Sequence, residues 1–121
     1  MPEDQDLAGL RPTGSEQSPA LSAELLVALR AAFAGEADRR LPRLRRLQQH
    51  PGPQLLEQAL RDAHSLASSA AIVGAADVAR CAARVEAGLE RCLRDPAPGL
   101  PAPVAADAEQ LTALLDCWLH A

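Results

Sequence analysis

Apolar residues recur at intervals of three and four residues through most of this chain, and proline and glycine separate the stretches in which they do so. This spacing places the apolar side chains on one face of an α-helix and does not fit the two-residue alternation of a half-buried strand. The clearest stretch is 75–94, where the apolar positions are Val78, Cys81, Ala82, Val85, Leu89 and Cys92. The pattern therefore predicts an all-α protein.

The breaks in this pattern set the bounds of the predicted helices. A first apolar stripe begins after Ser18-Pro19, the expected N-cap and first turn, and Gly35 weakens or ends that helix. A second stripe runs from residue 36 to about residue 50 and contains Pro42, which is expected to kink the helix or to lie in its first turn. Residues 19–49 therefore form either one bent helix or two. Further helices are predicted over 53–74, where Gly74 ends the helix, over 75–94 and over 103–119.

These stretches together predict an up-and-down helical bundle, with a four-helix core and one additional or kinked helix at its N-terminal end. Residues 1–17 are polar and contain little to bury, so we expect a disordered tail there and a bundle domain over 18–121. Hydrophobic residues make up 48% of the chain and aromatic residues 2%. The core must therefore be built from alanine, leucine and valine, which suits closely packed helices.

Charge and cysteine content narrow the class of protein. The formal net charge of −4 argues against general nucleic-acid binding. Cys81, Cys92 and Cys117 are too widely spaced for a Cys-x-x-Cys pair, so we expect them to be small buried residues of a protein in a reducing compartment. No apolar run is long enough to span a membrane. We therefore expect a cytoplasmic protein without a membrane partner.

The helix predicted over 53–74 divides into an apolar half and a polar half, and only Ile72 breaks the division. His64 lies on the polar side of the border, beside Leu60 and Ala71, so we expect its ring to be accessible to a partner. No second histidine follows three or four residues later, and no metal site is predicted. A histidine on a helix surface is often merely a polar residue, so periodicity alone leaves its role open. The polar half is formed by Glu57, Gln58, Arg61, Asp62, His64, Ser65, Ser68 and Ser69.

A short motif surrounds His64. It consists of Ala63-His64-Ser65-Leu66, Ser69-Ala70 and Val73-Gly74-Ala75, and is followed by Cys81 and the pair Val85-Glu86. These residues resemble the signature of histidine-containing phosphotransfer (HPt) domains, which runs His-x-Leu-Lys-Gly-Ser-Ala with an apolar residue, Gly and Ala a few positions later. The resemblance implies a helical bundle in which His64 is the exposed phosphoryl acceptor.

The same resemblance implies a phosphocarrier of a two-component phosphorelay and not an enzyme. His64 would accept a phosphoryl group from an aspartate of one receiver domain and pass it to another receiver. The implied partners are response-regulator receiver domains and a hybrid sensor histidine kinase, with the protein acting as a monomer. No cofactor is implied for this chain, because the receiver supplies its own Mg²⁺.

Two positions depart from the family signature. Ala67 stands where the family has lysine, and Ser68 stands where it has glycine. The chain contains no lysine, so only an arginine can supply the missing charge; Arg61, one turn before His64, is the nearest, while Arg80 and Arg84 are weaker candidates. The alternative is a degenerate module that binds a receiver or a kinase without carrying phosphate. The predicted docking and supporting positions around His64 are Arg61, Ser65, Ala67, Ser68, Ser69 and Gly74.

The run Arg39–Arg46 contains five arginines and allows two interpretations. We favour the first, in which these residues form the solvated face of an amphipathic helix. In the second, they form a basic surface that steers an acidic receiver pocket or a kinase toward docking.

Overall fold

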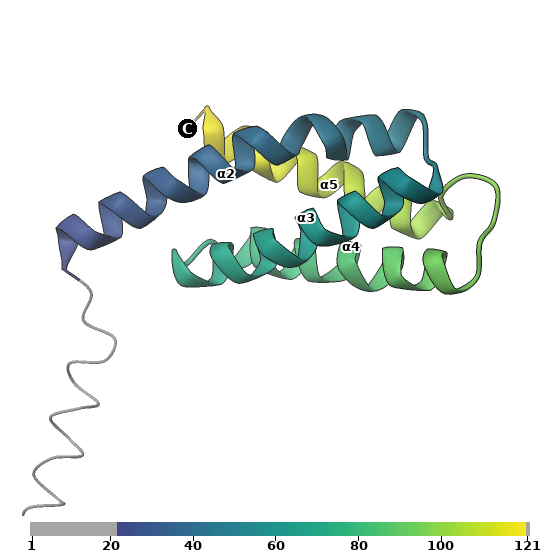
Figure 1. Ribbon diagram of the computed structural model, residues 1–121. Coiled ribbons are helices and arrows are strands. Elements are labelled where there is room, and N and C mark those ends of the chain that lie inside the picture. Colours follow the sequence, from purple (N-terminus) through teal and green to yellow (C-terminus); the bar gives the residue numbers. More distant parts are fainter. Residues whose placement is uncertain (1–21, 121) are drawn as a thin grey trace, which may run out of the picture.

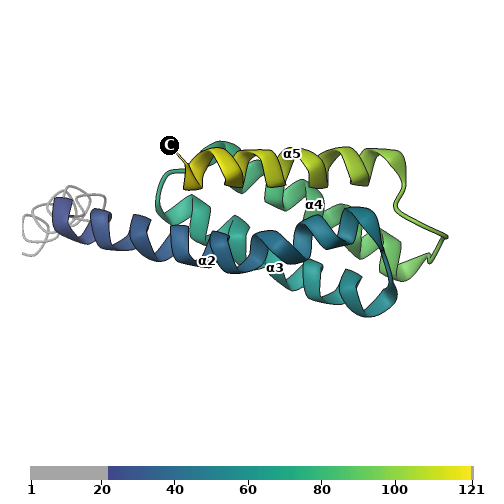
Figure 2. The same cartoon turned by 90° about the horizontal axis from the view of Figure 1, so that it is seen from above.

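The fold was analysed in a computed structural model that describes residues 22–120, and four α-helices form that part of the chain (Figure 1). They are α2 (Ala23–Gln49), α3 (Pro53–Ile72), α4 (Ala76–Arg94) and α5 (Ala102–Leu119). Each helix packs against two others, in the closed order α2, α3, α4, α5 and back to α2. Seen from above, consecutive helices lie side by side and run in opposite directions (Figure 2). The prediction of an all-α up-and-down bundle is confirmed.

The long helix α2 decides between the two alternatives left open for residues 19–49. It is one unbroken helix, which continues through both Gly35 and Pro42. Its predicted start at Ser18-Pro19 lies outside the described residues, as does the predicted tail over 1–17. The described helix begins at Ala23, where Ser22 Oγ accepts a hydrogen bond of 3.0 Å from the Leu25 amide. The helix tolerates an internal proline because its buried face packs against the bundle; that face is formed by Phe33, Ala37, Leu41, Leu44 and Leu47.

The turn between α3 and α4 depends on Gly74. This residue has φ +77°, a conformation that favours glycine, and the Ala75 amide donates to the Ala70 carbonyl over 2.8 Å. This bond satisfies a carbonyl at the end of α3, as in other glycine-terminated helices. Gly74 therefore stops α3 as predicted, although the helix itself ends at Ile72.

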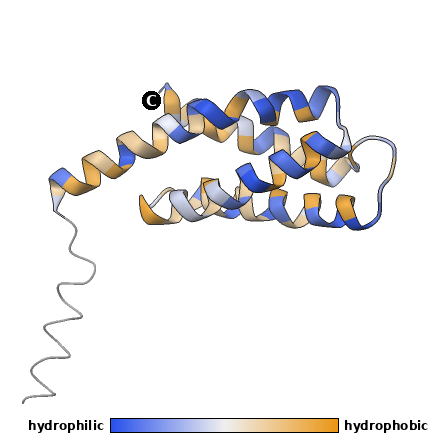
Figure 3. Cartoon of the chain, viewed as in Figure 1, coloured by the Kyte–Doolittle hydropathy of each residue, from blue (hydrophilic) through white to orange (hydrophobic). Residues whose placement is uncertain are grey.

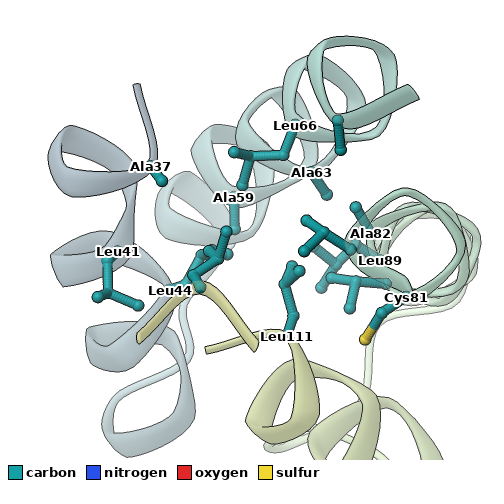
Figure 4. Packing of buried hydrophobic residues seen from close by; sticks show 14 of the residues in the cluster. Ala37, Leu41, Leu44, Ala59, Ala63, Leu66, Cys81, Ala82, Leu89 and Leu111 are labelled. Atoms are coloured by element: carbon teal, nitrogen blue, oxygen red, sulfur yellow. The ribbon is translucent and has the colours of Figure 1, made fainter. Parts of the chain in front are cut away.

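The core lies along the bundle axis and is made largely of small and branched aliphatic residues (Figure 4). Ala59 and Ala63 of α3 and Ala82 of α4 all belong to the core, and none of the three is exposed to solvent. Alanine at these positions lets the two helices approach closely. Of the cysteines, Cys81 and Cys92 are buried as predicted, whereas Cys117 is exposed. That prediction was wrong because Cys117 lies on the face of α5 opposite Leu115, which is buried.

The first turns of α2 extend beyond the bundle (Figure 1) and are mostly hydrophobic (Figure 3). Leu25 and Val27 are exposed there, as is Ile72 at the end of α3. None of the four helices is long and apolar enough to cross a membrane.

Two glycines inside helices are expected to respond oppositely to replacement by alanine. A Cβ at Gly88 of α4 would lie 2.9 Å from Cγ2 of Val104 in α5, whereas a Cβ at Gly35 of α2 would meet Arg39 at an ordinary 3.5 Å. Gly88→Ala should therefore lower the free energy of unfolding by about 1–2 kcal/mol through overpacking. Gly35→Ala should raise it by about 0.5–1 kcal/mol through helix propensity.

Urea denaturation followed by circular dichroism measures both changes, and Gly35→Ala serves as the matched control for Gly88→Ala. Equal stabilisation by the two replacements would contradict the close contact between α4 and α5.

Candidate functional site

His64 lies midway along α3 with 71% of its side chain exposed. Its Nδ1 atom is 2.7 Å from Oε2 of Glu86 on the neighbouring helix α4. An ionised carboxylate can only accept a hydrogen bond, so the proton lies on Nδ1. In the neutral imidazole, Nε2 then keeps its lone pair, and no group in the described part of the chain hydrogen-bonds to it. The ring therefore offers one free nucleophilic nitrogen to solvent.

A surface depression surrounds one side of the His64 ring. The α4 edge of this depression carries the carboxylates Glu86 and Glu90, and the α2 edge carries the guanidinium groups of Arg40 and Arg43. His64 therefore lies where an acidic edge meets a basic edge. The depression is lined in full by Arg40, Arg43, Gln58, Leu60, Arg61, Asp62, His64, Ser65, Glu86 and Glu90.

The basic edge is organised by Asp62, which is completely buried. Arg43 donates from Nε and Nη2 to the two carboxylate oxygens over 2.7 and 2.6 Å. Arg40 donates from Nη1 to Oδ1 over 2.6 Å. We call these three residues the Asp62 clamp; it joins α2 to α3 by charge-assisted bonds of the short, bidentate kind. The hydrogen bonds to Asp62 raise the pKa of Arg43 despite its partial burial.

The clamp extends along the two helices to Glu36 and Ser65. Arg40 donates to Glu36 over 2.8 Å and to the Ser65 hydroxyl over 3.1 Å, and that hydroxyl in turn donates to Glu36 over 2.6 Å. Burial raises the pKa of the Glu36 carboxyl. Hydrogen bonds from Ser65 and Ser69, together with Arg40, more than offset burial and hold this pKa below its ordinary value of 4.5. Glu36 is therefore part of the ionised network.

The predicted supporting residues are divided between the surface and this network. Arg61 is exposed, borders the depression beside His64 and has no carboxylate within ion-pair distance in the described residues. Ser68 is exposed, but its hydroxyl donates to the backbone carbonyl of His64 over 3.3 Å. Ser65 and Ser69 are half-buried and turn toward Glu36, so they support the α2–α3 contact.

The remaining predicted positions do not contribute polar groups to the site. Ala67 is half-buried and packs against the core, and Gly74 forms the turn at the end of α3. Arg80 and Arg84, the weaker candidates for the missing lysine, are held elsewhere. Arg80 pairs with Asp77, and Arg84 bonds to Asp107 and Gln110 of α5.

Two interpretations of the sequence were wrong at this site. Asp62 was placed on the polar half of its helix, but it is buried against α2 because two arginines there neutralise it. Arg40 and Arg43 were assigned to a solvated face, but both turn inward to Asp62. The partnership between Glu86 and His64 was also missed, since Glu86 entered only as part of a motif. In the described residues, no group of three or more possible ligands converges to hold a metal ion.

The fold and site define a class of protein: a four-helix bundle that presents one histidine midway along a helix. One nitrogen of its ring is hydrogen-bonded, and the other has no partner in the described residues. The model of the Hpt domain family matches residues 28–117, and the chain therefore belongs to this family. No curated protein and no solved structure matches it significantly.

Removing the charge of Asp62 should strongly destabilise the bundle. Asp62→Asn keeps the shape of the side chain but leaves Arg43 without a counter-charge in the described residues and Arg40 with Glu36 alone, which should cost about 2–4 kcal/mol of unfolding free energy. Asp38→Asn on the exposed side of α2 is the matched control and should change stability by less than about 0.5 kcal/mol. Urea titrations of both variants measure the difference, and equal small effects would show that the clamp contributes nothing to stability.

The lowered pKa of Glu36 predicts a pH dependence of stability. Because the folded-state pKa lies below the ordinary value of 4.5, the ionised group stabilises the fold above that pH. This contribution is lost as the pH falls through the folded-state pKa. Unfolding free energies measured from about pH 6 to about pH 3 should fall more steeply for the wild type than for Glu36→Gln. Glu57→Gln, at an exposed position of α3, should keep the wild-type slope.

Proposed function

We propose that this protein is a phosphocarrier of a two-component phosphorelay and that His64 is its phosphoryl acceptor. The observation that carries the proposal is the exposed His64 ring in a chain of the Hpt family. Its Nδ1 bonds to Glu86, and its Nε2 has no hydrogen-bond partner among the described residues. Hpt domains interact with receiver domains and histidine kinases. The proposed partners are accordingly response-regulator receivers and a hybrid sensor kinase, met in the cytoplasm by a monomer of this chain.

The proposed step uses the free nitrogen directly. Nε2 of His64 attacks the phosphorus of a receiver aspartyl phosphate, a P–N bond forms, and the P–O bond to the aspartyl carboxylate breaks. The carboxylate leaves with the bonding electron pair. The ring becomes a phosphoimidazolium. Its proton stays on Nδ1 and remains hydrogen-bonded to Glu86. Transfer to a second receiver reverses these steps, so the carrier needs no proton shuttle of its own.

Glu86 is a positioning residue in this proposal. Its bond to Nδ1 selects the tautomer in which Nε2 is the nucleophile, and it holds the ring orientation in which Nε2 points to solvent. A carboxylate at this position also stabilises the positive ring that forms when Nε2 is phosphorylated. The same bond therefore serves both the accepting and the donating direction.

Arg61 supplies the positive charge that a lysine provides in the family signature. It borders the same depression as His64, whereas Arg40 and Arg43 are bound to carboxylates. Its long side chain, which pairs with no carboxylate within residues 22–120, can follow a phosphoryl group or a receiver carboxylate. The side chains of Ala67 and Ser68 are small, so a receiver can approach the helix surface next to His64 closely.

A transfer assay separates this function from that of a degenerate docking module. The chain is incubated with receiver domains of the same organism that carry labelled aspartyl phosphate, and acid-labile label on the chain is followed. We expect transfer to the wild type and none to His64→Gln. Equal labelling of His64→Gln would disprove the assignment. Receiver binding that is retained in His64→Ala, without any transfer to the wild type, would establish the degenerate module instead.

Replacing Glu86 should slow transfer without abolishing it. Glu86→Ala removes the hydrogen bond to Nδ1 and should lower the transfer rate about 3–10-fold, while Glu86→Gln keeps an accepting oxygen and should lower it less. Glu90→Ala is the control, since Glu90 borders the depression one turn further along α4 but does not bond to His64. Rates taken from single-turnover transfer at a saturating receiver concentration isolate the chemical step. Similar rates for Glu86→Ala and Glu90→Ala would contradict the positioning role.

A further inference from the structure

Three surface depressions follow one another along the contact between α2 and α3, which we call the α2–α3 seam. One contains Arg39 of α2 beside Ser69 and Ile72 of α3, and the central one is the depression next to His64. The third contains Arg46 beside Gln54 and Gln58. An arginine of α2 therefore borders each part of the seam.

These arginines share one face of α2 because Arg39, Arg43 and Arg46 are spaced by four and three residues. Arg45 faces away from them and pairs with Asp116 of α5. Arg43 is fixed to Asp62 through Nε and Nη2. Arg39 and Arg46 are exposed, and neither has a carboxylate within ion-pair distance in residues 22–120.

The seam has a surplus of positive charge although the whole chain is acidic. On α2 and α3, five arginines border the three depressions, and only two carboxylates do so, Glu36 and Asp62. Those two carboxylates are already bound by Arg40 and Arg43. The three remaining charges belong to Arg39, Arg46 and Arg61, and we call these the seam arginines. Across the central depression, α4 contributes the carboxylates Glu86 and Glu90, so the surplus belongs to the α2 and α3 side of the seam, in a chain with a formal net charge of −4.

We infer that the seam arginines form a docking surface for the acidic face of a receiver domain and that they set the rate at which the receiver associates. The inference rests on the proposed function for the identity of the partner. A receiver must bring its acceptor aspartate to Nε2 of His64, and the pocket that holds this aspartate also binds Mg²⁺ through oxygen ligands, so it is rich in carboxylates. Its rim then lies over the seam, where opposite charges attract.

The geometry favours a protein partner over nucleic acid. Three separated arginines along the contact between two helices form a short basic strip. The net negative charge of the chain repels a long polyanion. Carboxylates that surround a single acceptor site match such a strip in extent. Exposed charges of this kind act mainly on the association rate, and salt screens them.

The test compares two double variants with equal change in charge. Arg39→Glu with Arg46→Glu reverses the two seam arginines that lie outside the His64 depression. Arg30→Glu with Arg91→Glu reverses two exposed arginines away from the seam. For each protein, the second-order rate of phosphotransfer is measured from about 0.03 to about 0.5 M NaCl. The donor is the receiver that exchanges phosphate fastest with the wild type in a profile of receivers from the same organism.

We expect the seam variant to transfer about ten-fold more slowly than the wild type at low salt and within about two-fold of it at high salt. The control variant should follow the wild type throughout. Equal rates for the seam variant and the wild type at low salt would overturn the inference, as would equal losses in both variants, which would reflect net charge alone. The inference would also be overturned if the wild type and the control variant bound a short DNA duplex, the seam variant did not, and phosphotransfer were unchanged. The strip would then be a nucleic-acid site.

Two further measurements, one with a small phosphodonor and one of receiver binding without transfer, keep this test distinct from that of the proposed function. Phosphoramidate, a small phosphodonor, should label His64 equally in the wild type and the seam variant, because it does not dock on the seam. If the wild type takes up no label from phosphoramidate or any receiver, the proposed function is wrong. The docking surface is then tested by receiver binding measured by fluorescence anisotropy, where a salt-independent affinity, or one unchanged by the seam variant, overturns it.

Discussion

The buried carboxylate of Asp62 is the interaction on which the arrangement of α2 and α3 depends. Its two oxygens accept three short bonds from Arg40 and Arg43. A buried carboxylate is tolerated only when it is paired and fully hydrogen-bonded. The clamp therefore fixes the position of α2 along α3, and with it the place of the arginines beside His64.

The bundle itself follows from features that are visible in the sequence. Apolar spacing, the break at Pro51-Gly52-Pro53 and the left-handed turn at Gly74 predict three of the four described helices closely, because each depends on local geometry. The continuity of α2 through Gly35 and Pro42 was not predictable in this way. It depends on tertiary packing of the buried face of α2, which outweighs the helix propensity of both residues.

The polar contacts of the site were missed because a helical wheel treats each helix alone. In an antiparallel hairpin, residues at equal distance from the turn lie side by side. Arg40 and Asp62 are each 11 residues from Pro51, and His64 and Glu86 are each 11 residues from Ala75. Hairpin register would thus have indicated both pairs. It would not have shown that Asp62 is fully buried, since burial depends on how closely the neighbouring helices pack.

The loss of the family lysine has a consequence for a phosphocarrier. A phosphoryl group adds about 1.5–2 negative charges, and a single exposed cation at about 4 Å offsets them by only about 1 kcal/mol per unit charge in water. A carrier needs no stronger stabilisation of the phosphoryl group. Every interaction that stabilises the phosphorylated state must be broken when the group is transferred to the next receiver. In the proposed relay, Arg61 and Glu86 both act on His64 from the depression beside its ring. The clamp keeps the charges of Arg40 and Arg43 engaged with carboxylates, so that they do not hold the phosphoryl group in place.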